Sequence, residues 1–93
     1  MKHLFSIEGD KIQFNPETIT LNQYNQAFCK RTEALRLESG HTDITIFANM
    51  LGMTARQYAK HEASTPLPHC LILLFCSITK SELIELFNFP LEH

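Results

Sequence analysis

The stretch FANMLGMTARQYAKHE, residues 47–62, decides the fold of this chain, because it predicts two short helices joined by a sharp turn. Phe47 and Leu51 lie one helical turn apart on the same face, and Ala48 is small enough to let a second helix cross closely. Gly52 can adopt the positive φ that most side chains resist, so the first helix is expected to end there.

The second helix of this stretch begins after Thr54, a favourable N-cap residue. Tyr58 faces inward, whereas the outer side carries small and polar side chains. Such a helix fits the major groove of DNA, where Arg and Lys reach guanine, Gln pairs with adenine and an alanine methyl contacts thymine. Taken alone, the same side chains would indicate only a solvated face. With the turn before them, we expect DNA contacts from Thr54, Ala55, Arg56, Gln57 and Lys60.

This pattern resembles the helix-turn-helix of the phage repressor and Cro family (Xre type), over roughly residues 24–87. The family has a leucine-alanine pair, a glycine, a small hydroxyl residue, an inward apolar residue and a closing glutamate. The matching positions are Phe47-Ala48, Gly52, Thr54, Tyr58 and Glu62. The resemblance implies a mainly α fold, namely a five-helix, lambda-repressor-like helix-turn-helix domain.

The resemblance also implies one long-range ion pair. Family members often join an arginine near the end of the first helix to the glutamate that closes the recognition helix, and Arg36 and Glu62 match these positions. If the pair is partly buried, loss of either partner leaves an uncompensated charge and destabilises the fold. The alternative is two solvated charges that contribute little.

The helix before the opening stretch should run to about Ser39 and end at Gly40. Asp43, or Thr42 before it, is then expected to cap the following helix. The family commonly has a phosphate-binding glutamine at the start of that helix, where this chain has isoleucine. We therefore expect phosphate contacts there from Thr45, His41 and the backbone amides of the helix start. Two further candidates on the preceding helix are Lys30 and Arg31.

Two more helices are predicted after Pro66, similar to the family's fourth and fifth. The fourth should begin near Pro68 and carry Leu71, Leu74 and Phe75 into the core. The fifth, capped by Thr79 or Ser81, has more apolar residues than one buried stripe needs. We expect the surplus to form a homodimer interface made of Leu83, Ile84, Phe87 and Phe89, with an N-terminal hairpin as the alternative interface.

The N-terminal segment has a different pattern from the rest. Two short β-compatible runs, 4–7 and 12–14, flank a sequence of turn composition and predict a small β-hairpin extension. We divide the chain into this extension (1–19), the helix-turn-helix domain (20–90) and residues 91–93, which look like the start of a vector-encoded polyhistidine tag.

Composition indicates one small folded domain. The chain has 93 residues, 44% of them hydrophobic, with three glycines and four prolines. No apolar run is long enough to cross a bilayer, and the three cysteines suit a reducing compartment, so a cytoplasmic protein is expected. The net charge of -2 argues against DNA binding, although residues 25–64 carry five basic and four acidic side chains.

No pattern in the chain indicates an enzyme or a cofactor. The spacing of His61, His69, Cys70 and Cys76 is unlike that of structural zinc sites, so no metal is expected. His61 is interpreted as a packing residue rather than a catalytic base.

These observations lead to two functional hypotheses. The first is a sequence-specific DNA-binding transcriptional regulator, a repressor that reads an inverted repeat of double-stranded DNA as a homodimer. The alternative is a protein-interaction module, or an antitoxin-like protein that binds a toxin or another protein partner, with this fold and little or no DNA binding.

Overall fold

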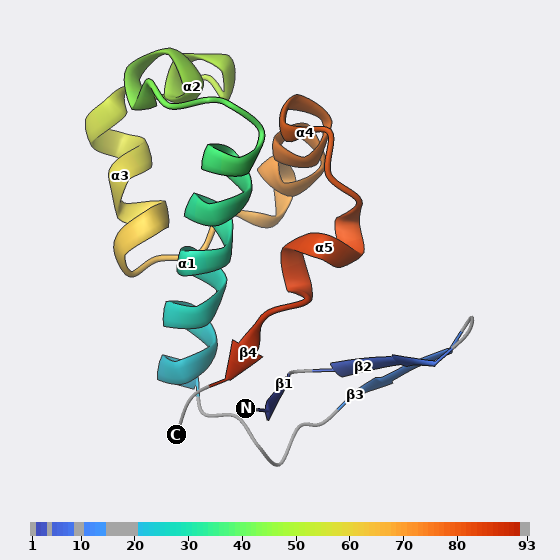
Figure 1. Cartoon of the computed structure of the whole chain (residues 1–93). Coiled ribbons are helices and arrows are strands. Elements are labelled where there is room, and N and C mark those ends of the chain that lie inside the picture. The colour runs from blue at the N-terminus through green and yellow to red at the C-terminus, as the bar shows by residue number, and fades with distance from the viewer. Residues whose placement is uncertain (1, 4, 9–10, 15–20, 92–93) are drawn as a thin grey trace.

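The computed structural model describes residues 2–3, 5–8, 11–14 and 21–91. The described part is mainly helical, with five helices: α1 (Leu21–Glu38), α2 (Ile44–Met50), α3 (Ala55–Ala63), α4 (His69–Thr79) and α5 (Leu83–Phe87). Figure 1 shows α3 on one side of α1, α4 and α5 on the other, and α2 across the top, beyond the end of α1. The mainly α, five-helix prediction is confirmed.

The turns between the first three helices follow the predicted chemistry. Gly40 and Gly52 have φ of +89° and +79°, which glycine adopts at no steric cost. The N–H of His41 donates to the carbonyl of Arg36 at 3.2 Å, and that of Met53 to the carbonyl of Ala48 at 2.9 Å. These bonds satisfy carbonyls that would otherwise lack a partner at each helix end.

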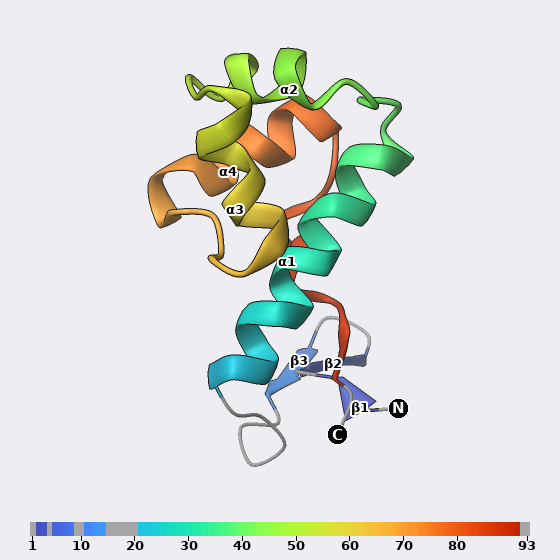
Figure 2. The ribbon, with the colours of Figure 1, turned by 90° about the vertical axis from the view of Figure 1, so that its left-hand side faces the viewer.

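Every helix contributes at least one large side chain to a single core. Phe28, Phe47, Tyr58, Phe75 and Leu86, taken from α1 to α5 in order, are each 1% exposed or less. The ring of Phe47 makes edge contacts with both Tyr58 and Phe75. Figure 2 shows α3 running beside α1, against which it packs. The core therefore fixes the position of α3 relative to the rest of the molecule.

Helices α4 and α5 differ from the prediction in two places. Leu74 was expected in the core, but it is 42% exposed, because the buried face of α4 is made by Phe75, Cys76 and Thr79. The cap of α5 is Glu82 rather than Thr79 or Ser81. Thr79 belongs to α4, where its hydroxyl donates to the carbonyl of Phe75 at 2.9 Å.

Four short strands complete the described residues. β1 (Lys2–His3) pairs antiparallel with β4 (Pro90–Leu91), and β2 (Phe5–Glu8) pairs antiparallel with β3 (Lys11–Phe14). The predicted turn includes residues 9–10, which lie outside the described residues, as do 15–20 and 92–93. The hairpin extension therefore stays a prediction.

Candidate nucleic-acid interface

Helices α2 and α3 form a two-helix unit whose second helix has a well-defined start. The N–H of Gln57 donates to the hydroxyl of Thr54 at 3.1 Å, and the N–H of Thr54 donates to the side-chain oxygen of Gln57 at 2.9 Å. This reciprocal capping box confirms Thr54 as the N-cap. It also shows what the prediction for Gln57 left out, namely that its oxygen already accepts a hydrogen bond within α3.

A buried polar group joins α3 to α1. The Arg36 guanidinium forms two hydrogen bonds with the Glu62 carboxylate, Nε to Oε2 at 2.7 Å and Nη2 to Oε1 at 3.1 Å. The two side chains are 7% and 6% exposed, so the implied pair is confirmed in its buried form. Two parallel bonds of this kind fix orientation as well as proximity.

Tyr58 is the third member of this group, which we call the α1–α3 brace (Arg36, Tyr58 and Glu62). Its hydroxyl donates to Glu62 Oε2, and Arg36 Nη1 also donates to the carbonyl of His41 at 2.7 Å. Sequence reasoning placed Tyr58 inward but assigned its hydroxyl no partner. The four-residue spacing from Tyr58 to Glu62 on one helix was the available signal.

Burial and hydrogen bonding change the acid-base properties of the brace. Burial, followed by the hydrogen bond to Glu62, raises the pKa of the Tyr58 hydroxyl above its usual value of 10.0. The hydrogen bond that Arg36 donates to Glu62 is the main cause that raises the pKa of Arg36. Near neutral pH, Tyr58 is therefore a neutral hydrogen-bond donor and Arg36 is a cation.

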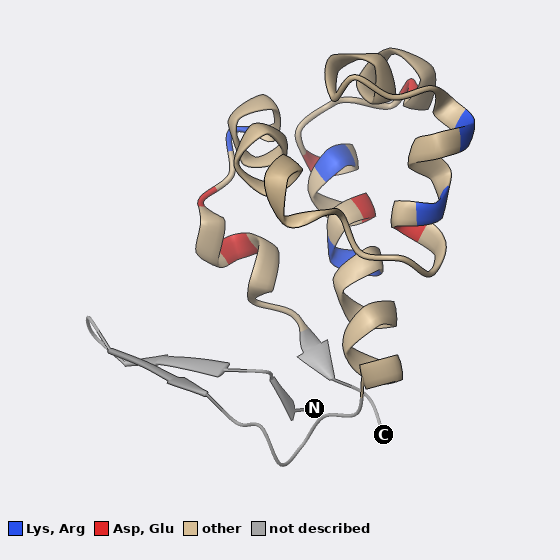
Figure 3. Ribbon diagram, turned by 180° about the vertical axis from the view of Figure 1, so that it is seen from behind, with Lys and Arg blue, Asp and Glu red and all other residues tan. Residues whose placement is uncertain are grey.

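The outer side of α3 is polar and accessible. Arg56, Gln57 and Lys60 are exposed and Ala55 is half-buried. Figure 3 shows the basic positions of α3 at the edge of the molecule, away from α4 and α5. Since the charge of Glu62 is paired with Arg36, the accessible charges of α3 are the two basic ones.

The start of α2 is not the anion site that was expected. The carboxylate of Asp43 accepts the N–H groups of Thr45 and Ile46 at 2.9 and 3.2 Å. Its negative charge occupies the position that a phosphate would take and opposes a second anion there. The backbone amides of this helix start are thus removed as a phosphate contact, whereas the exposed Thr45 side chain remains a candidate.

The two histidines near the unit are part of the packing. His41 Nε2 donates to the carbonyl of Ile78 at 3.3 Å, and its ring contacts Phe47. His41 therefore links the α1–α2 turn to α4, which leaves a phosphate contact less favoured than predicted. His61 is 3% exposed, and its Nδ1 donates to the carbonyl of Thr65 at 2.7 Å, as expected of a packing residue.

The predicted dimer residues do not share one exposed face. Phe89 is 2% exposed and lies against Tyr24 and Phe28, so its assignment to an interface is wrong. Ile84 and Phe87 are partly buried against the same core. Of the four, only Leu83 is largely accessible, at 48%. The sequence did not identify the two α4 leucines that are also exposed, Leu73 and Leu74.

The cysteines and other candidate ligands are dispersed. Cys29 and Cys76 are buried, and burial raises the pKa of both thiols, whereas Cys70 is exposed. Nowhere in the described part of the chain do three or more histidine, cysteine, aspartate or glutamate side chains come together as a metal-binding group. No helix among the described residues has both the length and the apolarity needed to cross a membrane.

Comparisons of the chain with protein-family models, with curated proteins and with solved structures find no match.

Proposed function

We propose that this protein is a sequence-specific DNA-binding regulator, a repressor in which α3 lies in the major groove of double-stranded DNA. The finer fold proposed with it is a lambda-repressor-like helix-turn-helix domain with a short N-terminal hairpin. The observation that carries the proposal is the buried α1–α3 brace, which orients α3 while Arg56 and Lys60 remain exposed. A rigid helix with an accessible basic side is what groove recognition requires.

Within this proposal, the side chains of α3 have different roles. Arg56 and Lys60 contact guanine or phosphate, and Ala55 contacts a thymine methyl. Gln57 reads adenine through its amide nitrogen, because its oxygen already accepts the N–H of Thr54. Thr54 and Thr45 contact backbone phosphates through their hydroxyls.

The protein is further proposed to act as a homodimer on an inverted repeat. A single α3 of nine residues spans only about 13 Å, which is little more than one half-site needs. Leu73 and Leu83, which are exposed and line one hollow between α4 and α5, support self-association through these helices.

A second candidate function is supported by α2. Asp43 places a carboxylate at the helix start, and Ile46 and Met50, one turn apart, are 60% and 45% exposed. An apolar surface next to an acidic group suits a protein partner better than a phosphate backbone. In this alternative the protein is a partner-binding module, antitoxin-like, with little or no DNA binding.

Titration of duplex DNA at several salt concentrations tests the proposal and separates the two candidates. Binding by the wild type should weaken with salt, and the Arg56→Ala/Lys60→Ala double variant should bind more weakly with a slope of log K against log[salt] reduced by up to about 2. Lys80→Asn, which removes an exposed cation from the α4–α5 turn, is the matched control and should change binding little. Absence of binding at low salt, or unchanged binding by the double variant, refutes the role of α3 and favours the partner-binding module.

A further inference from the structure

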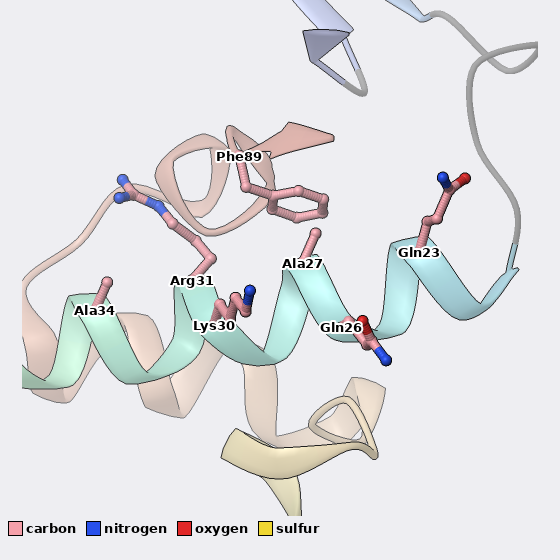
Figure 4. A pocket seen from close by; sticks show the side chains of 7 residues that line it. All are labelled: Gln23, Gln26, Ala27, Lys30, Arg31, Ala34 and Phe89. Atoms are coloured by element: carbon pink, nitrogen blue, oxygen red, sulfur yellow. The ribbon is translucent and has the colours of Figure 1, made fainter. Parts of the chain in front are cut away.

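A cavity of about 290 Å³ lies along α1, beside the segment that follows α5 (Figure 4). The residues that α1 contributes recur every three or four positions from Gln23 to Ala34, so they share one side of the helix. Its volume is near the lower end of the range for small-molecule sites, about 300–1,000 Å³. None of the α2 and α3 residues proposed to contact DNA lines it.

The inner surface of this cavity is apolar. Ala27 and Ala34 leave space because their side chains are single methyl groups, and only an edge of the Phe89 ring, which is 2% exposed, reaches the adjoining wall. Figure 4 shows the Phe89 ring over Ala27, on the same side of α1 as Arg31. Phe89 is held in place by edge contacts with Tyr24 and Phe28. The apolar surface is therefore preformed, which reduces the entropy lost on binding.

Two cations lie at the same cavity, Lys30 and Arg31. Arg31 Nε donates to the backbone carbonyl of Glu85 at 2.7 Å, which positions the guanidinium without neutralising it. The Glu85 carboxylate instead accepts the N–H of Glu82 at 2.7 Å. Among the described residues, the ion pair that the structure shows is Arg36 with Glu62, so neither Lys30 nor Arg31 has a carboxylate partner there.

We infer that this cavity binds a small amphipathic anion, an aromatic or short aliphatic carboxylate. Its carboxylate contacts Lys30 and Arg31, since a guanidinium binds a carboxylate through paired hydrogen bonds. Its apolar part lies on Ala27 and Ala34, beside the edge of the Phe89 ring, where it is removed from water. A DNA backbone has the charge but no apolar group for this surface, so Lys30 and Arg31, which the sequence offered as phosphate contacts, are assigned to this site instead. The site does not depend on the DNA contacts proposed for α3.

The test is a titration of the full chain with 4-phenylbutyrate, followed by the chemical shifts of backbone amides and aromatic side chains. Saturable shifts should appear at residues 23–34 and at Phe89. The neutral analogue 4-phenylbutyramide should bind about tenfold more weakly, because it lacks the charge that Lys30 and Arg31 bind. Inorganic phosphate should produce no saturable shifts at Phe89, because it lacks an apolar part.

Three variants locate the site. Lys30→Gln changes an exposed side chain and should weaken binding about fivefold, within the range for loss of a charge-assisted contact. Ala34→Leu fills the cavity and should abolish binding. Lys80→Asn removes an exposed cation elsewhere, so probe binding should be unchanged. Asparagine tolerates the left-handed backbone conformation of this position. If Ala34→Leu does not fold, the comparison of probe binding by Lys30→Gln and by Lys80→Asn still tests the site.

Several results would overturn the inference. These are the absence of saturable shifts up to the solubility of the probe, equal binding of the acid and the amide, and shifts that Lys30→Gln leaves unchanged. Displacement of the probe by a short duplex DNA would assign the two cations to DNA binding instead, and would also refute a separate site.

Discussion

The α2–α3 side and the α4–α5 side of the molecule are held against α1 by different kinds of contact. On the first, the brace joins α3 to α1 through two directional hydrogen bonds from Arg36 to the Glu62 carboxylate, both buried side chains. On the second, α5 and the residues after it pack mainly through rings, with Phe28 against Phe87 and Phe89, beside one hydrogen bond from Arg31 to the carbonyl of Glu85. Directional bonds fix the angle of a helix, whereas apolar contacts fix mainly its proximity.

The exposed surfaces of α3 and of α4–α5 also differ. The side fixed by polar bonds presents the basic residues Arg56 and Lys60, and the side fixed by rings presents Leu73 and Leu83. A surface that binds specific DNA bases needs a defined orientation, whereas a surface for self-association needs exposed apolar area. The contrast therefore agrees with the proposal of α3 for DNA and of α4–α5 for a second copy.

The largest effect is expected from breaking the brace. Glu62→Ala should lower the free energy of unfolding by about 3–5 kcal/mol, because it leaves the buried Arg36 charge without its carboxylate and with only the His41 carbonyl as a partner. Chemical denaturation measures this change. The double variant Arg36→Met/Glu62→Leu is the control and should lose less than Glu62→Ala, since neither charge remains. A loss below about 1 kcal/mol for Glu62→Ala would mean that the pair behaves as a solvated one.

On the other side, removal of a ring should cost nearly as much. Phe89→Ala should lower stability by about 3 kcal/mol, the low end for a buried phenylalanine, because the half-buried Tyr24 can move into part of the space. Leu83→Ala is the matched control, and its loss should be below about 1 kcal/mol because Leu83 is largely exposed. Equal losses for the two variants would contradict the assignment of Phe89 to the core.

Tyr58→Phe separates the hydroxyl from the ring and sharpens the account of the brace. At neutral pH it should lower stability by about 1.5–3 kcal/mol, the range for a hydrogen bond to a charged group. Because folding raises the pKa of Tyr58 above 10.0, the unfolded chain loses this proton first, so wild-type stability falls as pH rises past that value. The difference in free energy of unfolding between Tyr58→Phe and the wild type should therefore be smaller at about pH 10.5 than at neutral pH. A constant difference would contradict the neutral-donor role.

The smallest effect on folding is expected from Leu83→Asp, which tests the association surface. Stability should change by about 0.5 kcal/mol or less, because the side chain is accessible. Self-association, measured by light scattering or sedimentation, should weaken because a charge enters an apolar contact. A wild type that stays monomeric at high concentration refutes dimerisation through α4 and α5.

Features that depend on one residue and its near neighbours were predictable from the sequence. The glycines that end α1 and α2 and the caps Asp43 and Thr54 lie where local turn and capping chemistry places them. The Arg36–Glu62 pair was implied by resemblance, since nothing local connects residues 26 positions apart. The role of Gln57 in the capping box was also readable, because Thr followed three residues later by Gln is the capping-box pattern.

Features set by tertiary packing were not predictable. Leu74 and Phe75 are adjacent and similarly apolar, and only the direction of α4 against the core makes the first exposed and the second buried. Phe89 lies after the last helix, so helical spacing gives no information on where its ring packs. The cavity beside α1 combines that ring with α1 residues some sixty positions earlier, and no sequence pattern joins them.

The hydroxyl contact between Tyr58 and Glu62 has an optical consequence. The chain has two tyrosines and no tryptophan, so its ultraviolet emission comes from Tyr24 and Tyr58 alone. A phenol that donates a hydrogen bond to a carboxylate loses its excited-state proton to that acceptor and emits weakly at the usual tyrosine wavelength. Tyr58 is therefore dark while its hydroxyl donates to Glu62 and becomes bright when that bond breaks, as it does when α3 unfolds. The protein carries its own fluorescent reporter of this contact within α3, with no added label.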